Sequence, residues 1–153
     1  MDLTLYSVLK FFHVVAAVIA VGFNASYGIW LARAAKEPEH AAHVVRGIKI
    51  LDDRFANPAY AVLLLLGLAM VWEAGIPLDT FWIAASLVLY VVLVGLAIAG
   101  YSPALRRQVE LAEAGRVDTD EYRQTAKRSG AFGGILGVIV VVIIFFMVTK
   151  PTL

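Results

Sequence analysis

The chain has 153 residues, no cysteine and a formal net charge of +1, and 61% of its residues are hydrophobic. A soluble domain of this size is usually about 45–50% apolar, so the composition indicates a membrane protein rather than a soluble one. The lack of cysteine excludes disulfides, thiolate metal sites and cysteine nucleophiles.

Four apolar runs separated by charged segments predict an all-α membrane protein, a single-domain four-transmembrane-helix bundle with up-down topology. The predicted spans are about residues 5–31, 55–72, 80–100 and 131–148. A helix needs roughly 20 apolar residues to cross about 30 Å of hydrocarbon. The first run follows Asp2 rather than a basic leader and is too long for the apolar core of a signal peptide, so we interpret it as a retained helix.

Basic residues gather in two of the three connecting segments and predict the orientation. These two segments contain Arg33, Lys36, Arg46, Lys49, Arg54, Arg106, Arg107, Arg116, Arg123, Lys127 and Arg128. The segment between the second and third spans has no basic residue, and its only charged residues are Glu73 and Asp79. Because short basic loops stay in the cytoplasm, we expect the first and third connections inside and both termini outside.

The third connection is itself expected to be helical. SPALRRQVELAEAGR continues the third span and should end near Gly115, which is a suitable C-cap. A new helix should then begin in DTDEYRQTAKR, with Asp118 or Thr119 as its N-cap.

One face of the first span combines small and polar side chains. At 100° per residue, the following residues lie within about 40° of His13: Ala17, Ala20, Asn24 and Tyr27. Phe11, Val15 and Ile19 point elsewhere. Since polar side chains avoid acyl chains and small ones mark helix contacts, His13 is predicted to face protein.

The third and fourth spans show related patterns. Ser86, Tyr90 and Tyr101 form a weaker polar stripe on the third span. In the fourth span, the pairs Gly130/Gly134 and Gly133/Gly137 have the small-xxx-small spacing that favours close helix packing, in a monomer or a homodimer equally.

Three uses of the intramembrane His13 remain open. It can form a structural hydrogen bond near Asn24, to Ser86, to Tyr90 or to a backbone carbonyl. It can be the axial ligand of haem b, or it can serve a proton relay or a copper site. In the first case the chain is a structural or accessory membrane protein without a cofactor.

Haem b is the leading cofactor prediction. Four-helix bundles commonly hold haem, and the small residues around His13 leave room for a flat macrocycle. Lys10, one turn outward, can reach the interface or pair with a propionate. The candidate cofactor-binding residues are His13, Lys10, Asn24 and Tyr90.

Copper is the alternative metal prediction. Met70 and Met147 lie on the outer segments of their spans, and with His13 they form a donor set suited to soft Cu(I). His40 and His43 lie on the expected cytoplasmic side and cannot join them. Transport is poorly supported, because the predicted spans contain no ionisable group besides Lys10 and His13.

Several segments carry a family resemblance: LKFFHVVAAVIAVG, NPAYAVLLLLGLAMVW, FWIAASLVLYVV, YSPALRRQVELAEAG and, at Met147 to Pro151, MVTKP. They resemble a family of small bacterial four-span membrane proteins of unknown function. This resemblance implies a multi-pass protein of the bacterial inner membrane, with the lipid bilayer as its partner and no nucleic acid.

The first two segments are also similar to the copper-resistance D domain and to HemJ-type membrane protoporphyrinogen oxidases. Those oxidases bind haem through a histidine of the first span, which carries over to His13 alone. The third span has no lysine where the HemJ-type proteins carry a functional one, so their activity is not predicted here.

Overall fold

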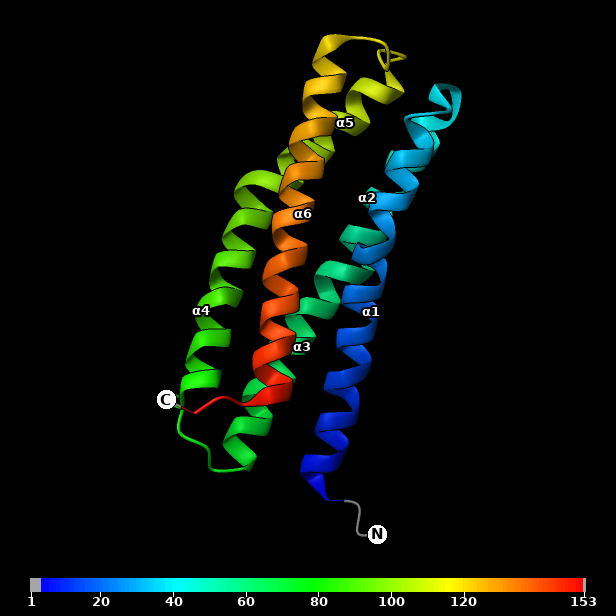
Figure 1. Ribbon diagram of the computed structural model, residues 1–153. Coiled ribbons are helices and arrows are strands. Elements are labelled where there is room, and N and C mark those ends of the chain that lie inside the picture. The colour runs from blue at the N-terminus through cyan, green and yellow to red at the C-terminus, as the bar shows by residue number, and fades with distance from the viewer. Residues whose placement is uncertain (1–3, 153) are drawn as a thin grey trace.

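The computed structural model describes residues 4–152, and every regular element in this range is helical (Figure 1). In chain order they are α1 (Leu5–Ala34), η1 (Pro38–His40), α2 (Ala41–Leu51), η2 (Asp52–Ala56), α3 (Asn57–Glu73), α4 (Phe81–Leu96), η3 (Ala97–Tyr101), α5 (Ser102–Glu113) and α6 (Asp120–Thr149). Four continuous helical segments are long and apolar enough to cross a membrane: Leu5–Ala34, Pro38–Glu73, Phe81–Glu113 and Asp120–Thr149. The predicted all-α, four-helix architecture is confirmed.

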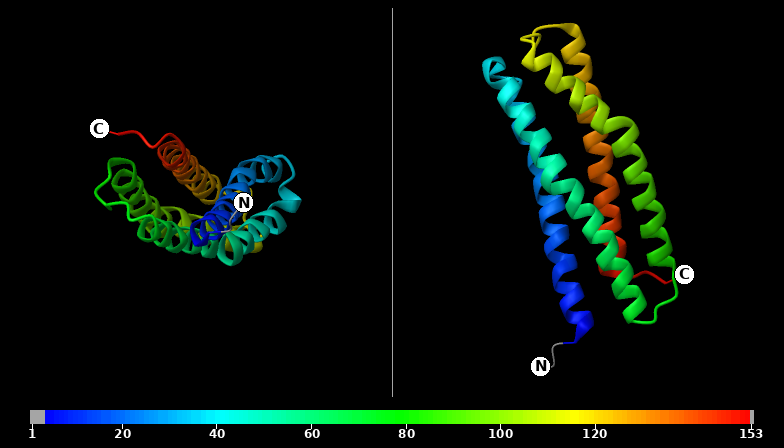
Figure 2. Two further views of the ribbon diagram at one scale, coloured as in Figure 1. Left: turned by 90° about the horizontal axis from the view of Figure 1, so that it is seen from below. Right: turned by 180° about the vertical axis from the view of Figure 1, so that it is seen from behind.

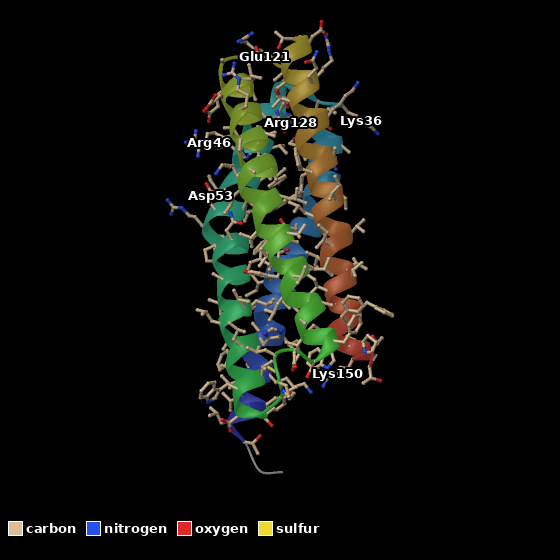
Figure 3. The ribbon with its side chains drawn as sticks, turned by 90° about the vertical axis from the view of Figure 1, so that its left-hand side faces the viewer. Lys36, Arg46, Asp53, Glu121, Arg128 and Lys150 are labelled. Atoms are coloured by element: carbon tan, nitrogen blue, oxygen red, sulfur yellow. The ribbon has the colours of Figure 1, made fainter. Side chains whose placement is uncertain are left out.

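The four segments run alternately up and down, and both termini lie at the same end (Figures 1 and 2). Lys36, Arg46, Glu121 and Arg128 gather at the opposite end, while Lys150 lies near the termini (Figure 3). We call these the basic end and the terminal end. That the basic end faces the cytoplasm stays a prediction.

The helices form two halves that meet mainly at the basic end. Helix α1 packs along α3 in one half, and α4 packs along α6 in the other. The short α2 and α5 pack against each other and join the halves. Among the described residues, no Cα atom of α4 comes within 8 Å of one in α1 or α3. The views in Figures 1 and 2 show the same division.

The best-packed core therefore lies toward the basic end. Tyr27, Ile48, Tyr101 and Leu105 form a buried cluster, and partly buried hydrophobic residues surround it. Toward the terminal end, large apolar side chains are exposed on the outside of the bundle, as expected of a surface that meets acyl chains.

The predicted stripe on α1 faces the bundle. Ala20 and Tyr27 are buried and His13 is half-buried, whereas Phe11 and Val15 are exposed. The pattern arises because small and polar side chains gain contacts with protein, and large apolar ones lose nothing in lipid.

The helices extend well beyond the predicted spans. The second span begins with α2 and runs without a break into α3, and the third continues through α5. The expected helix ends in the third connection are confirmed: Gly115 has φ +70°, and the Thr119 hydroxyl accepts the amide of Tyr122 at 3.3 Å.

Two π turns interrupt these long helices. In η2 the amide of Asn57 donates to the carbonyl of Asp52, five residues earlier, and Ser102 donates in the same way in η3. The next residue is Pro58 in one and Pro103 in the other. A proline has no N–H and its ring crowds the preceding turn, so a wider turn accommodates it while the helix continues.

Within this single chain, the glycines of α6 do not make the predicted close contact with a helix, and a contact with a second chain stays a prediction. A Cβ atom added at Gly130, Gly134 or Gly137 would meet nothing within 4 Å, and one at Gly133 would only touch the Tyr101 ring at 3.7 Å. These glycines border a cavity between the two halves instead of a neighbouring helix. The spacing of small residues would allow another helix to pack closely against α6, but it does not determine whether a helix lies there.

Candidate functional site

His13 lies at the terminal end, between α1 and α3. It comes so close to Gly67 that an added Cβ there would lie 3.2 Å from His13 Cε1 and 3.6 Å from Nδ1. A Cβ contact of 3.2 Å is unusually tight, so the glycine gives the imidazole room beside the backbone of α3. The ring thus packs against protein on this side, as the sequence predicted.

The Nδ1 atom of His13 is buried and has no hydrogen-bond partner among residues 4–152, although the Leu63 backbone lies close enough to interact with the ring. A buried ring nitrogen without a partner is costly, and each such case in a native protein calls for an explanation. The hydroxyl groups expected to satisfy it bond elsewhere. Ser86 Oγ donates to the carbonyl of Trp82 at 2.7 Å, and Tyr90 Oη donates to the carbonyl of Tyr60 at 3.0 Å.

A cavity of ≈ 90 Å³ adjoins the imidazole, and all four long helices line it. Its lining includes His13, Met70, Met147 and Tyr90. Both methionines are half-buried, so they are not exposed lipid-facing bulk. The structure therefore brings the three predicted metal ligands to one cavity.

Lys10 and Asn24 are not part of this cavity. Lys10 is exposed and lines neither of the two cavities described here. Asn24 lies three turns further along α1, where its Nδ2 donates to the Tyr60 hydroxyl at 3.0 Å. His13, Lys10 and Asn24, predicted to surround one cofactor, therefore do not share a cavity. Tyr90 lines both the cavity beside His13 and the cavity between the two halves, which Asn24 also lines.

His40 ends η1 and His43 lies in the first turn of α2, so both lie between Lys36 and Arg46 of the basic end and away from His13 (Figure 3). Within residues 4–152, no three histidine, aspartate or glutamate side chains come together as a metal site would require. The set of His13, Met70 and Met147 is of another kind, because two of its three donors are methionine sulfurs.

A second polar cluster, toward the basic end, was missed by the sequence reasoning. Asp52 is 4% exposed and accepts a hydrogen bond from Asn57 Nδ2 at 3.3 Å. The hydroxyl of Tyr27 is buried nearby and has no partner among the described residues. Asp52 precedes the predicted second span, in the first of the two basic connecting segments, where the sequence predicts no site.

A signal for Asp52 was present in the sequence. Ala41, Val45 and Ile48 form the buried face of α2, and Asp52 follows at the next position of the same 3–4 spacing. A helical pattern read through the charged segment would have placed this carboxyl inside.

Comparison with known proteins identifies a family but no described function. No curated protein and no solved structure matches the chain. The proposed similarity to copper-resistance D domains and HemJ-type oxidases thus gains no support from the comparisons. One family matches residues 7–151, nearly the whole chain, and its description agrees with the four long apolar helices. The chain belongs to the family described as "Predicted integral membrane protein (DUF2269)".

Proposed function

We propose that this integral membrane protein binds Cu(I) at its terminal end, through His13 Nδ1 and the thioether sulfurs of Met70 and Met147. The observation that carries the proposal is the unpartnered Nδ1 beside a cavity that both methionines also line. Thioether is a soft donor that Cu(I) prefers, and neutral imidazole also suits copper. None of the described residues that line the cavity carries a carboxylate that would favour a harder ion.

The size of the cavity favours an ion over a macrocycle. A cavity of about 150 Å³ holds a benzene molecule, and the space beside His13 is ≈ 90 Å³. A porphyrin is many times larger than benzene, and Gly67 already lies against the imidazole. Haem b does not fit here without separating α1 from α3, so haem at His13 stays a prediction with less support than copper.

A purely structural role for His13 is also less well supported. A histidine that ties helices together should have its ring nitrogens satisfied by protein groups. Here Nδ1 has no partner among the described residues, and two of the expected partners, Ser86 and Tyr90, donate to carbonyls of other residues. Of the expected kinds of partner, the backbone at Leu63 is the one that lies close enough to interact with the ring.

The test is Cu(I) binding to the full chain, purified in detergent under anaerobic conditions and titrated against a chromophoric Cu(I) chelator. We expect one tightly bound ion per chain, and Ag(I), a soft ion without accessible redox chemistry, should compete for it. His13→Gln, Met70→Leu and Met147→Leu should each weaken binding by at least about tenfold. Methionine to leucine nearly conserves volume, so the fold should survive.

The matched control is His43→Gln, which removes an exposed histidine at the basic end. It should leave the affinity for Cu(I) unchanged. Binding that none of the three ligand variants weakens would contradict the proposal. So would a Soret band that His13→Gln abolishes, since that result would assign the imidazole to haem.

A further inference from the structure

A second cavity, larger than the one beside His13, lies between the two halves of the molecule, toward the basic end. Its volume is ≈ 920 Å³, within the range of about 300–1,000 Å³ that ligand pockets commonly have. Side chains of α1, α3, α4 and α6 line it, together with both π turns. The space exists because α4 stays away from α1 and α3, and because glycines cover the facing side of α6.

Asp52 is the only residue with a charged side chain among those that line this cavity. It is almost fully buried, and its one hydrogen bond comes from the neutral amide of Asn57. Lys49, one turn earlier on α2, forms its ion pair with Asp53 instead. A buried carboxylate without a cationic partner is strongly destabilising, so the cavity is chemically incomplete as it stands.

Aromatic side chains surround the same space. Four tyrosines line it: Tyr27, Tyr60, Tyr90 and Tyr101. The Tyr27 hydroxyl is buried and has no hydrogen-bond partner among the described residues, so it is a second polar group that lacks a compensating interaction. Tyrosine faces attract cations, most strongly where water is excluded.

Most of the rest of the lining is apolar or lacks side chains, although Asn24, Asn57, Ser102 and Ser129 also line the cavity. Valines of α6, Leu93 and Ile98 of the α4 segment, and the glycines of α6 provide most of the remaining surface. The π turns η2 and η3 place Asp52 and Tyr101 at the cavity, and π turns inside helices occur frequently at functional sites.

We propose that this cavity binds an organic cation with an apolar body, with the Asp52 carboxylate as its counter-charge and the tyrosines as its aromatic surround. The apolar body replaces the empty space beside the α6 glycines. The positive charge compensates a carboxylate for which the lining offers no basic side chain. This site is separate from the His13 cavity and does not depend on copper binding there.

The probe is tetraphenylphosphonium, a rigid cation with an apolar surface, and its binding to the full chain in detergent is measured by calorimetry. Tetraphenylborate has almost the same shape and the opposite charge, so it serves as the matched ligand control. We expect saturable binding of the cation and weaker binding of the anion. Asp52→Asn should reduce the affinity for the cation at least about tenfold, because it removes the only charge that compensates the buried ligand.

The matched protein control is Asp53→Asn. It removes a neighbouring carboxylate that is exposed and already paired with Lys49. Its affinity for tetraphenylphosphonium should match that of the unmodified chain. Copper binding should be unchanged in both aspartate variants, so a failure of this proposal is distinguishable from a failure of the copper proposal.

A steric variant tests the site without altering its charge. Gly134→Leu projects a side chain into the cavity from α6, where an added Cβ meets nothing within 4 Å. It should abolish binding of the cation. Gly22→Leu is its control, because Gly22 on α1 also has open space but does not line the cavity.

Three results would overturn the proposal. The first is equal binding of cation and anion, as expected of a slot for lipid chains. The second is full affinity of Asp52→Asn, as expected of a carboxyl that carries no charge. The third is a stable dimer in which neither ion binds and Gly134→Leu dissociates the chains, because a second copy would then occupy the space.

Discussion

Gly100 is the most tightly packed of the glycines, so the methyl group of an alanine at this position would test a helix contact. It is buried in η3, and a Cβ atom added there would lie 2.3 Å from Cε1, 2.4 Å from Cζ and 2.7 Å from Cδ1 of Phe132. Phe132 on α6 packs against the core cluster around Tyr101, and the Arg128 guanidinium lies 5.8 Å from its ring centroid. The substitution Gly100→Ala therefore drives a methyl group into a held aromatic ring.

The two opposing effects of Gly100→Ala can be compared. Carbon atoms pack at about 3.5–4.0 Å, so the ring must move by roughly 1 Å or more to relieve the contact. Overpacking of this kind costs about 1–3 kcal/mol. Alanine gains at most about 1 kcal/mol over glycine in a helix, and less in a π turn. We expect a net loss of about 1–2 kcal/mol in unfolding free energy.

The assay is reversible unfolding in mixed micelles, followed by circular dichroism. Gly95→Ala is the control, since Gly95 lies on α4 with nothing within 4 Å of an added Cβ, and it should be neutral or stabilising. In a Phe132→Ala background, Gly100→Ala should cost nothing, which a double-mutant cycle measures directly. If Gly100→Ala were as stable as Gly95→Ala in the otherwise unmodified chain, the packing argument would be refuted.

Three further outcomes follow from polar groups and can be measured on the same preparations. Ser129→Ala should cost about 1–3 kcal/mol of unfolding free energy, because the buried Gln108 Oε1 loses a donor at 2.6 Å; a cost near zero would mean that water replaces the hydroxyl. Asn24→Ala removes the bond to the Tyr60 hydroxyl and should cost only about 0.6 kcal/mol, the usual size for polar contacts between membrane helices, and a loss several times larger would contradict this. Lys10→Gln should leave the affinity for Cu(I) unchanged, because the side chain is exposed and outside the cavity; a clear loss in the chelator titration would place the ammonium at the site.

The sequence predicts the parts of the fold that lipid dictates. Apolar runs identify four helices, and the separation of small and polar from large apolar residues identifies the inward face of α1. That face turns His13 toward protein and Phe11 away from it, as observed. These features depend on one helix and its solvent, so a single sequence contains them.

Features that depend on a second helix are harder to predict. The glycines of α6 match a packing pattern, but the distance between the halves leaves a cavity beside them. Asp52 lies in a charged segment that looks solvated in the sequence, and it is buried because α1 packs against η2. Similarly, the spacing of Met70, Met147 and His13 along the chain says nothing of their common cavity, which four different helices line.

The connection between the two halves explains why two separate cavities can exist in so small a bundle. Tyr90 on α4 lines both cavities, and its hydroxyl donates to the carbonyl of Tyr60 on α3. At this level no Cα atom of α3 lies within 8 Å of one in α4, so a side chain bridges the gap that backbone packing leaves open. The ring thus forms part of the wall between a cavity with soft donors and a cavity with a carboxylate. Helices α2 and α5 hold the two halves together at the basic end. Away from that end, side chains such as that of Tyr90 set the width of the space that a ligand in either cavity would enter.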